Sequence, residues 1–281
     1  MKNALYTITD EEFATLLERT NDAFEKSKIK YMLVGGTAVQ SHLAKILCVG
    51  GKTITNLVES PDFRVQDYFR ATDDIDLTLN RNGHGYDDVQ LGQAILSVLD
   101  DIEGKKEGSG YGDHMSPTEN HIVSIKLDRR GVSRPIFSLG LDGSPNSDKA
   151  VSFNIYKGPK DTNERWAAEI REFELLHYDE FMERRENVKI PFCSNKNLYW
   201  MVKNLEDLIA TKVVRGREKD WADVLLLARQ SELASKPINY SQVEKILCTP
   251  DKRYDKPNLA FVEKFEQFIK VKDSWKNPTS S

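Results

Sequence analysis

Residues 70–79 read Arg-Ala-Thr-Asp-Asp-Ile-Asp-Leu-Thr-Leu, and polar and apolar residues alternate from Asp74 onward. Successive side chains of a strand point to opposite faces, so the alternation predicts a strand with Asp74, Asp76 and Thr78 on one face. The two aspartates would lie about 6.6 Å apart along the backbone, where their charges repel each other. A divalent cation relieves that repulsion, and hard oxygen ligands suit magnesium. The stretch therefore predicts a magnesium site; the alternative is an ordinary strand whose polar face is in water.

The segment upstream of this strand contains a strand-to-helix turn. Residues 31–34 are apolar and are followed by Gly35, Gly36 and Thr37, which predicts a short buried strand, a turn and a helix over 37–47. Glycine lets backbone amides approach a phosphate closely, and the N-terminus of a helix favours anions. The turn is therefore a candidate phosphate site in which Thr37 caps the helix or binds the phosphate. The alternative is a glycine turn with an ordinary cap.

A third motif lies in the C-terminal half of the chain. Apolar residues recur at helical spacing over 205–213, and a run of charged residues follows. Gly216 is expected to end this helix, which places Asp220 and Asp223 in the opening turns of the next one. Lys212 carries a mobile point charge that suits a triphosphate. The alternative is a solvated run of charges that complements the helix dipoles.

The remaining pattern divides the chain into an α/β part over residues 1–160 and a helical part over residues 161–281. In the first part, Thr9 and Glu12 form a capping box that predicts a helix to about residue 26. Residues 48–69 show no clear period and are interpreted as an insertion. The other elements are predicted as a helix at 86–102, a loop at 103–120, strands at 121–128, 135–141 and 150–156, and helices at 163–185, 204–230, 241–247 and 258–270.

Composition excludes several classes of function. The chain has 281 residues, of which 39% are hydrophobic, but no apolar run approaches the roughly 20 residues that cross a bilayer. The start of the chain lacks an apolar signal core, and its 3 cysteines are scattered, so we expect a cytoplasmic protein with no membrane contact. The net charge of −4 means that any contact with nucleic acid needs a local basic patch. The 5 histidines lack the spacing of a zinc site or a hydrolytic triad.

In this order, the three motifs resemble those of the nucleotidyltransferase superfamily. The segments around Lys212 and Asp220 are similar to its AbiEii-type branch, which includes abortive-infection toxins and the related MenT toxins. The resemblance implies an α/β (α+β) fold: a mixed sheet flanked by helices, with a C-terminal helical domain that closes over the cleft. It also implies a magnesium-dependent transfer of NMP from NTP to an acceptor hydroxyl. The implied acceptor is a tRNA 3′ end, and the implied role is that of a toxin with an antitoxin partner.

The resemblance further assigns a role to each motif residue. The glycines and threonines would bind the nucleotide, and the charged residues would carry the catalysis. Asp223 would only pack between helices. The implied catalytic residues are Asp74, Asp76, Lys212 and Asp220, of which the two aspartates of the strand also hold magnesium. The implied nucleotide-binding residues are Gly35, Gly36, Thr37, Thr72 and Lys212.

Two departures from the family pattern leave other functions open. The spacing from Gly36 to Asp74 is longer than in the compact motif, which is why residues 48–69 would be an insertion. Many members also place a third carboxylate on a later strand, where this chain has Asn154, a neutral and weaker metal ligand. The chain could therefore be a degenerate, non-catalytic binding module. It could also modify a small cationic molecule such as an aminoglycoside, since the net charge is negative.

A tRNA acceptor requires a basic surface, for which the sequence offers two candidate groups. Clustered cations that neutralise phosphates supply most of the affinity for nucleic acid. We expect such a patch in one or both groups. The first group is Arg215, Arg217 and Lys219, and the second is Arg184 and Arg185.

Overall fold

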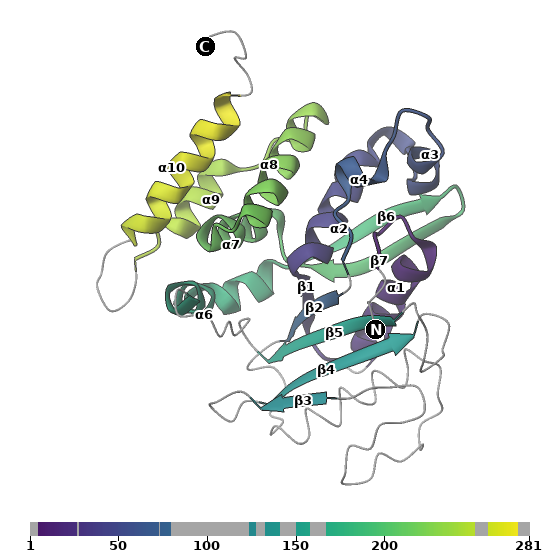
Figure 1. Ribbon diagram of the computed structural model, residues 1–281, viewed down its shortest axis with the longest axis horizontal. Coiled ribbons are helices and arrows are strands. Elements are labelled where there is room, and N and C mark those ends of the chain that lie inside the picture. Colours follow the sequence, from purple (N-terminus) through teal and green to yellow (C-terminus); the bar gives the residue numbers. More distant parts are fainter. Residues whose placement is uncertain are drawn as a thin grey trace.

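The computed structural model describes residues 5–26, 28–72, 74–79, 124–127, 133–140, 150–157, 167–250 and 258–274. Within these ranges the chain forms a mixed seven-stranded sheet flanked by helices (Figure 1). This confirms the predicted α/β class. The helix expected at 86–102 and the loop expected at 103–120 lie outside the described residues.

The elements alternate along the chain before a mainly helical C-terminal part. The strands are β1 (Tyr31–Val34), β2 (Asp74–Leu79), β3 (Ser124–Leu127), β4 (Ser133–Gly140), β5 (Ala150–Lys157), β6 (Glu186–Cys193) and β7 (Lys196–Val202). The helices are α1 (Glu11–Lys26), α2 (Gly35–Leu47), α3 (Ile54–Val58), α4 (Val65–Tyr68), α6 (Ala167–Arg184), α7 (Leu205–Arg215), α8 (Glu218–Leu233), α9 (Tyr240–Leu247) and α10 (Leu259–Ser274).

The strand that carries the two aspartates lies at the centre of the sheet. The strand order is β3-β4-β5-β2-β1-β7-β6. Strand β2 pairs antiparallel with β1, with Asp76 opposite Val34, and parallel with β5, with Asp76 opposite Asn154. Its apolar residues Ile75 and Leu77 are buried in the main core. The predicted alternation is therefore confirmed, and the polar face of β2 is held at the middle of the molecule.

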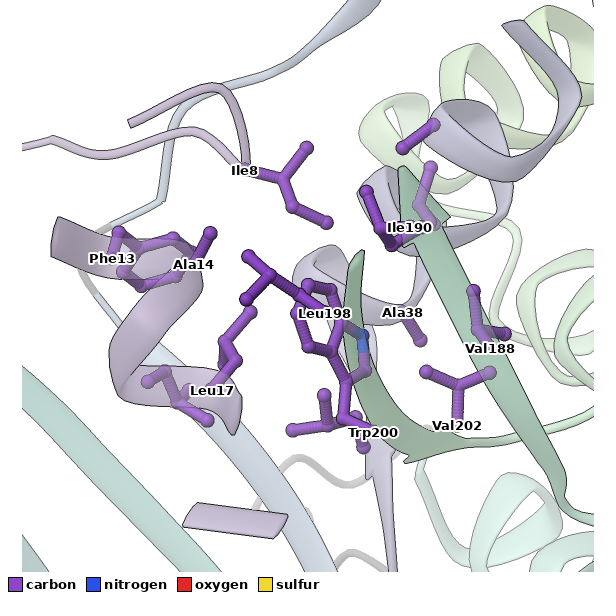
Figure 2. Close-up of a cluster of buried hydrophobic side chains, with 14 of the residues drawn as sticks. Ile8, Phe13, Ala14, Leu17, Ala38, Val188, Ile190, Leu198, Trp200 and Val202 are labelled. Carbon is purple, nitrogen blue, oxygen red and sulfur yellow. The ribbon is translucent and has the colours of Figure 1, made fainter. Parts of the chain in front are cut away.

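The main core lies between the sheet and the helices α1 and α2. Strand β7 places every second residue into it, and Figure 2 shows Leu198 and Trp200 between Leu17 of α1 and Ala38 of α2. The indole Nε1 of Trp200 donates a hydrogen bond of 2.9 Å to Oγ of Ser41 in α2. This packing fixes α2, and with it the turn at its start, against the sheet.

A second buried cluster joins the helices α6 to α10 and reaches the sheet at Met32 of β1. In Figure 1 these helices gather beside α2 and the strands β1 and β2. Asn204 caps α7, since its side chain accepts a hydrogen bond of 3.1 Å from the backbone N–H of Glu206. Gly216, with φ of 62°, ends α7 in the left-handed conformation, as predicted. The cluster thus sets α7 on the face of the sheet that carries Met32 and Val34 of β1 and Thr78 of β2.

Strands β6 and β7 form a hairpin that the sequence pattern did not predict. They follow residue 160, in the part expected to be helical, yet they extend the sheet beyond β1. A hint is present, because Val188, Ile190 and Phe192 alternate with more exposed residues. Leu198, Trp200 and Val202 continue the alternation in β7, but the prediction gave residues 186–203 no element. The sheet therefore crosses the boundary that was predicted at residue 160.

Two helix starts also differ from the prediction. The cap of α1 is Asp10 rather than Thr9, since Oδ1 of Asp10 accepts hydrogen bonds from the backbone N–H of Glu12 (3.0 Å) and Phe13 (3.3 Å). An aspartate is as good a cap as a threonine, and the helix starts one residue later than expected. Helix α2 starts at Gly35 and not at Thr37, so the two glycines form its first turn.

Candidate functional site

Hydroxyl groups hold Asp74, and the first turn of α2 lies against Asp76. Oγ1 of Thr72 lies 2.7 Å from Oδ1 of Asp74 and donates a hydrogen bond to it. Oγ1 of Thr37 donates a longer bond of 3.4 Å to the backbone oxygen of Asp74. The carboxylate of Asp76 is on the same strand face, and the residue is 5% exposed. The structure therefore places the predicted residues Thr37, Thr72, Asp74 and Asp76 together.

The glycine turn contacts these acids directly. Gly35 has φ of +69°, and a Cβ atom at this position would lie 2.4 Å from Oδ2 of Asp76. A Cβ atom on Gly36 would lie 3.2 Å from Nη2 of Arg70 and 3.9 Å from Oγ1 of Thr72. Glycine is required at Gly35 for both conformation and space. The start of α2 and the acidic face of β2 therefore form one surface.

Lys212 lies in a buried network of charges. Its Nζ atom donates to Oδ2 of Asp223 at 2.7 Å and to Oδ1 of Asp220 at 3.3 Å, and its side chain is 6% exposed. Asp220 also accepts bonds of 2.6 and 3.1 Å from Arg217. Burial alone would raise the pKa of Asp220, but the hydrogen bond from Arg217 and the charge of Lys212 outweigh burial and lower that pKa. Asp220 is thus ionised and bridges two cations.

Asp223 has a larger role than the predicted packing between helices. Besides Lys212, it accepts bonds of 3.4 Å from Nε and 3.3 Å from Nη2 of Arg70. Arg70 in turn lies against Gly36. The bond to Lys212 links α8 to α7, which agrees with the predicted packing role, and the bonds from Arg70 add a partner from the other half of the chain. Arg70 lies in the segment before β2, and Asp223 belongs to the helix pair α7–α8, so their bond joins these two parts. The contact of Arg70 with Gly36 adds the glycine turn to the same site.

This network gives a stability prediction for Asp223. In Asp223→Asn, an amide N–H₂ group replaces one carboxylate oxygen and faces the N–H groups of Lys212 or Arg70. We expect the free energy of unfolding to fall by about 1–3 kcal/mol, because a buried charged donor loses its acceptor. Urea unfolding followed by tryptophan fluorescence measures this. The matched control is Asp179→Asn, at an exposed position of α6; equal stability of the two variants would contradict the assignment.

A pocket adjoins this site on the side of α6 and α7. Gly35, Thr78 and Lys212 all line it, so it touches all three sequence motifs. The structure brings further residues to it that the sequence did not assign to such a pocket. They are Met32, Val34, Glu174, Tyr178, Phe181, Lys203, Leu208, Thr211 and Arg215, the last of which was predicted for a basic patch instead.

Lys203 is a buried cation of this pocket. It directly follows β7 and is 4% exposed. Its Nζ atom donates a bond of 2.6 Å to Oγ1 of Thr211 and lies 4.0 Å from the ring centre of Phe181. Burial lowers the pKa of Lys203 from 10.5 to about 8, although the charges of Glu174 and Asp207 oppose the shift. A single lysine after an apolar strand gives no sequence signal for such a position.

The lowered pKa makes the stability of the protein depend on pH in a defined direction. Between about pH 8 and 10.5 the unfolded chain holds a proton on Lys203 that the folded chain has lost, so the folded state gains stability as pH rises through this window. In Lys203→Met this gain is absent. Across this window we expect the free energy of unfolding of the wild type to rise by on the order of 3 kcal/mol relative to that of the variant.

Urea unfolding of wild type and Lys203→Met at about pH 7 and about pH 10 tests this dependence. At the lower pH the variant should be at least as stable as the wild type. The substitution removes a buried positive charge that is hydrogen-bonded to the hydroxyl of Thr211 and not to an acid, and burying such a charge is costly. An exposed substitution, Lys245→Met, should show no pH-dependent difference. Parallel behaviour of wild type and Lys203→Met would refute the lowered pKa.

Three of the five residues that were expected to form a basic patch for tRNA are bound to carboxylates. Arg215 is 9% exposed, and its Nη2 atom donates a bond of 2.7 Å to Glu174. Arg184 is bound to Asp207 at 2.9 Å and to Glu180 at 3.2 Å. Arg217 is bound to Asp220. Each of the three arginines is thus paired with a carboxylate, which is distant in sequence for Arg215 (Glu174) and for one partner of Arg184 (Asp207).

The donor set of β2 fits a magnesium ion with two protein carboxylates. Among the described residues there is no group of three or more His, Cys, Asp or Glu side chains that could hold a metal ion. Asn154 lies opposite Asp76 in the register of β5, which is where a third acid was expected. Magnesium commonly takes one or two carboxylates and completes its shell with water and substrate phosphates. Asp74 and Asp76 satisfy that requirement.

Comparison of the sequence with models of known protein families and with curated proteins gives no match. None of the helices in the described ranges is long and apolar enough to cross a membrane.

Proposed function

We propose that this chain is a magnesium-dependent nucleotidyltransferase that moves an NMP group from an NTP to an acceptor hydroxyl. One observation carries the proposal. The backbone of Gly35 lies against the carboxylate of Asp76 and lines the same pocket as Lys212. A phosphate-binding turn, a pair of metal-binding acids and a cation thus adjoin one another, which is the set of groups that phosphoryl transfer needs.

The reaction requires positioning and charge neutralisation more than covalent chemistry by the protein. The acceptor oxygen forms a bond to the α-phosphorus, the bond from that phosphorus to the bridging oxygen breaks, and pyrophosphate leaves. The hydroxyl proton passes to solvent. Magnesium held by Asp74 and Asp76 would supply positive charge to the phosphate oxygens.

The residues around the two acids would bind the nucleotide. Backbone N–H groups of Gly35 and Gly36 open the 13-residue helix α2, and a helix N-terminus attracts phosphate. Thr37 and Thr72 hold Asp74 in place. Arg70 lies beside Gly36 and its side chain is 45% exposed, so we add it to the candidate phosphate ligands. Lys212 and Asp220 would fix the α7–α8 side of the site.

The acceptor and the biological role follow only from the family resemblance. That resemblance supports a tRNA 3′ end as acceptor and a cytoplasmic toxin that has an antitoxin partner. The basic side chains Arg184, Arg215 and Arg217 are bound to acids, so a tRNA would need other cations. Lys219 is exposed and is one candidate.

The test is to incubate the protein with labelled NTPs, magnesium and total tRNA. We expect label on the tRNA and release of pyrophosphate, both lost without magnesium. A parallel reaction with an aminoglycoside in place of tRNA separates the small-molecule alternative by its antibiotic-dependent release of pyrophosphate. Absence of transfer to any acceptor would overturn the proposal.

A second candidate function is a non-catalytic nucleotide-binding module. Asn154 opposite Asp76 favours it, because a neutral ligand at the third position weakens the binding of a second metal ion. Calorimetry with NTP and magnesium, run beside the transfer assay, discriminates the two. Metal-dependent binding without transfer would favour the module, and binding together with transfer would favour the enzyme.

A further inference from the structure

The pocket beside the acidic strand contains a cation whose charge is not balanced by a bonded acid. Among the described residues, Lys212 is bound to Asp220 and Asp223, and Arg215 is bound to Glu174. Lys203 contacts a hydroxyl and an aromatic ring instead. The cation that the sequence assigned to phosphate binding is therefore already neutralised, whereas Lys203 is not.

The position of Lys203 is fixed by the strands around it. Its backbone N–H donates a bond of 3.0 Å to the oxygen of Leu33 in β1. Its backbone oxygen lies 2.8 Å from Nε2 of the buried His42 in α2. The side chain therefore starts from a rigid point and reaches the pocket between α6 and α7, where Thr211 holds the amine. A preorganised donor of this kind loses little freedom when it binds a ligand.

A second donor in the pocket lacks an acceptor. Nε of Arg215 is buried and has no hydrogen-bond partner among the described residues, while Nη2 of the same side chain is bound to Glu174. A buried N–H group without a partner is destabilising and is rare in native structures. Arg215 lines the pocket together with Lys203. The pocket therefore offers two positively charged donors whose bonding capacity is unfilled.

We propose that Lys203 is a substrate-binding residue, which binds a phosphate group of the nucleotide in this pocket together with Nε of Arg215. The assignment rests on the proposed function for the identity of the ligand. Met32 and Leu208 place apolar surface beside these donors, and charged hydrogen bonds are stronger in surroundings of low polarity. Lysine supplies a point charge and arginine a fixed N–H direction, and both suit a phosphate oxygen.

The proposal includes a proton linkage that the neighbouring charges define. Glu174 of α6 and Asp207 of α7 favour the charged form of Lys203, whereas Arg215 of α7 and Arg184 of α6 oppose it. Burial dominates, so the pKa of the free amine is about 8. A bound anion adds a negative charge and raises that pKa. At about pH 8, binding should therefore take up about half a proton.

The experiment measures binding of inorganic triphosphate without metal, by calorimetry at about pH 8 in two buffers that differ in ionisation enthalpy. Wild type should bind with proton uptake. Both Lys203→Met and Lys203→Gln should bind about 10- to 100-fold more weakly, without uptake. Lys203→Arg should bind without uptake, since arginine is always charged. The exposed control Lys245→Met should match the wild type.

Because the assay needs neither magnesium nor turnover, it separates this proposal from the transferase activity. Unchanged affinity in both Lys203→Met and Lys203→Gln would overturn the role of Lys203, as would a wild type that does not bind triphosphate. Transfer activity in such a protein would leave the proposed enzyme intact.

Discussion

Asp76→Asn should reduce the rate of nucleotidyl transfer by at least about 100-fold, and the variant should still fold. The substitution keeps the shape of the side chain that lies against Gly35, but it removes the negative charge that would hold magnesium. Loss of a charge-stabilising group at a phosphoryl-transfer centre typically lowers kcat by two or three orders of magnitude. Asp74→Asn should act in the same way, because both carboxylates belong to one donor set.

Labelled NTP transfer and pyrophosphate release measure the effect, with tryptophan fluorescence as a check of the fold. Asp62→Asn is the matched control, because Asp62 is exposed in the segment before β2 and should leave the rate unchanged. If Asp76→Asn transferred as fast as the control, the two acids would not be the metal site. Raising the magnesium concentration should restore part of the rate in the variant, because a weakened site is then refilled.

The central strands and the motifs on them could be predicted because they depend on local pattern. The alternation over 74–79 specifies a strand and its polar face, and the apolar run before Gly35 specifies β1 and the turn. Glycine at 216 marks the end of α7 for the same local reason. The hairpin of β6 and β7 carries the same alternation, but it stands between two long helical patterns and escaped prediction.

The partners of the site residues could not be predicted, because they are set by contacts distant in sequence. Arg70 and Asp223 are 153 residues apart and bind each other. Arg215 meets Glu174 across 41 residues, which removes it from the basic surface that the sequence suggested. The burial of Lys203 likewise depends on α6 and α7 together. Sequence pattern indicates which residues are able to carry chemistry, whereas the fold decides which of their charges stay available.

Gly35→Ala should lower the free energy of unfolding by about 2–5 kcal/mol, the sum of backbone strain and overpacking. A non-glycine residue at φ of +69° costs about 1–2 kcal/mol in backbone strain alone. The added Cβ atom would also lie 2.4 Å from Oδ2 of Asp76, a distance at which the turn or the buried carboxylate must move. That movement breaks the contact between α2 and β2, so transfer activity should fall together with stability.

Gly50→Ala separates the two causes, since Gly50 has φ of +73° and nothing within 4 Å of an added Cβ atom. In this variant the backbone strain is present, but the added Cβ atom meets no neighbouring atom. We expect its free energy of unfolding to fall by only about 1–2 kcal/mol. Urea unfolding of both variants gives the difference, which is the part due to the approach of Gly35 to Asp76. A similar loss in both would mean that the turn does not press on the acid, and the geometry that supports the enzyme would then be absent.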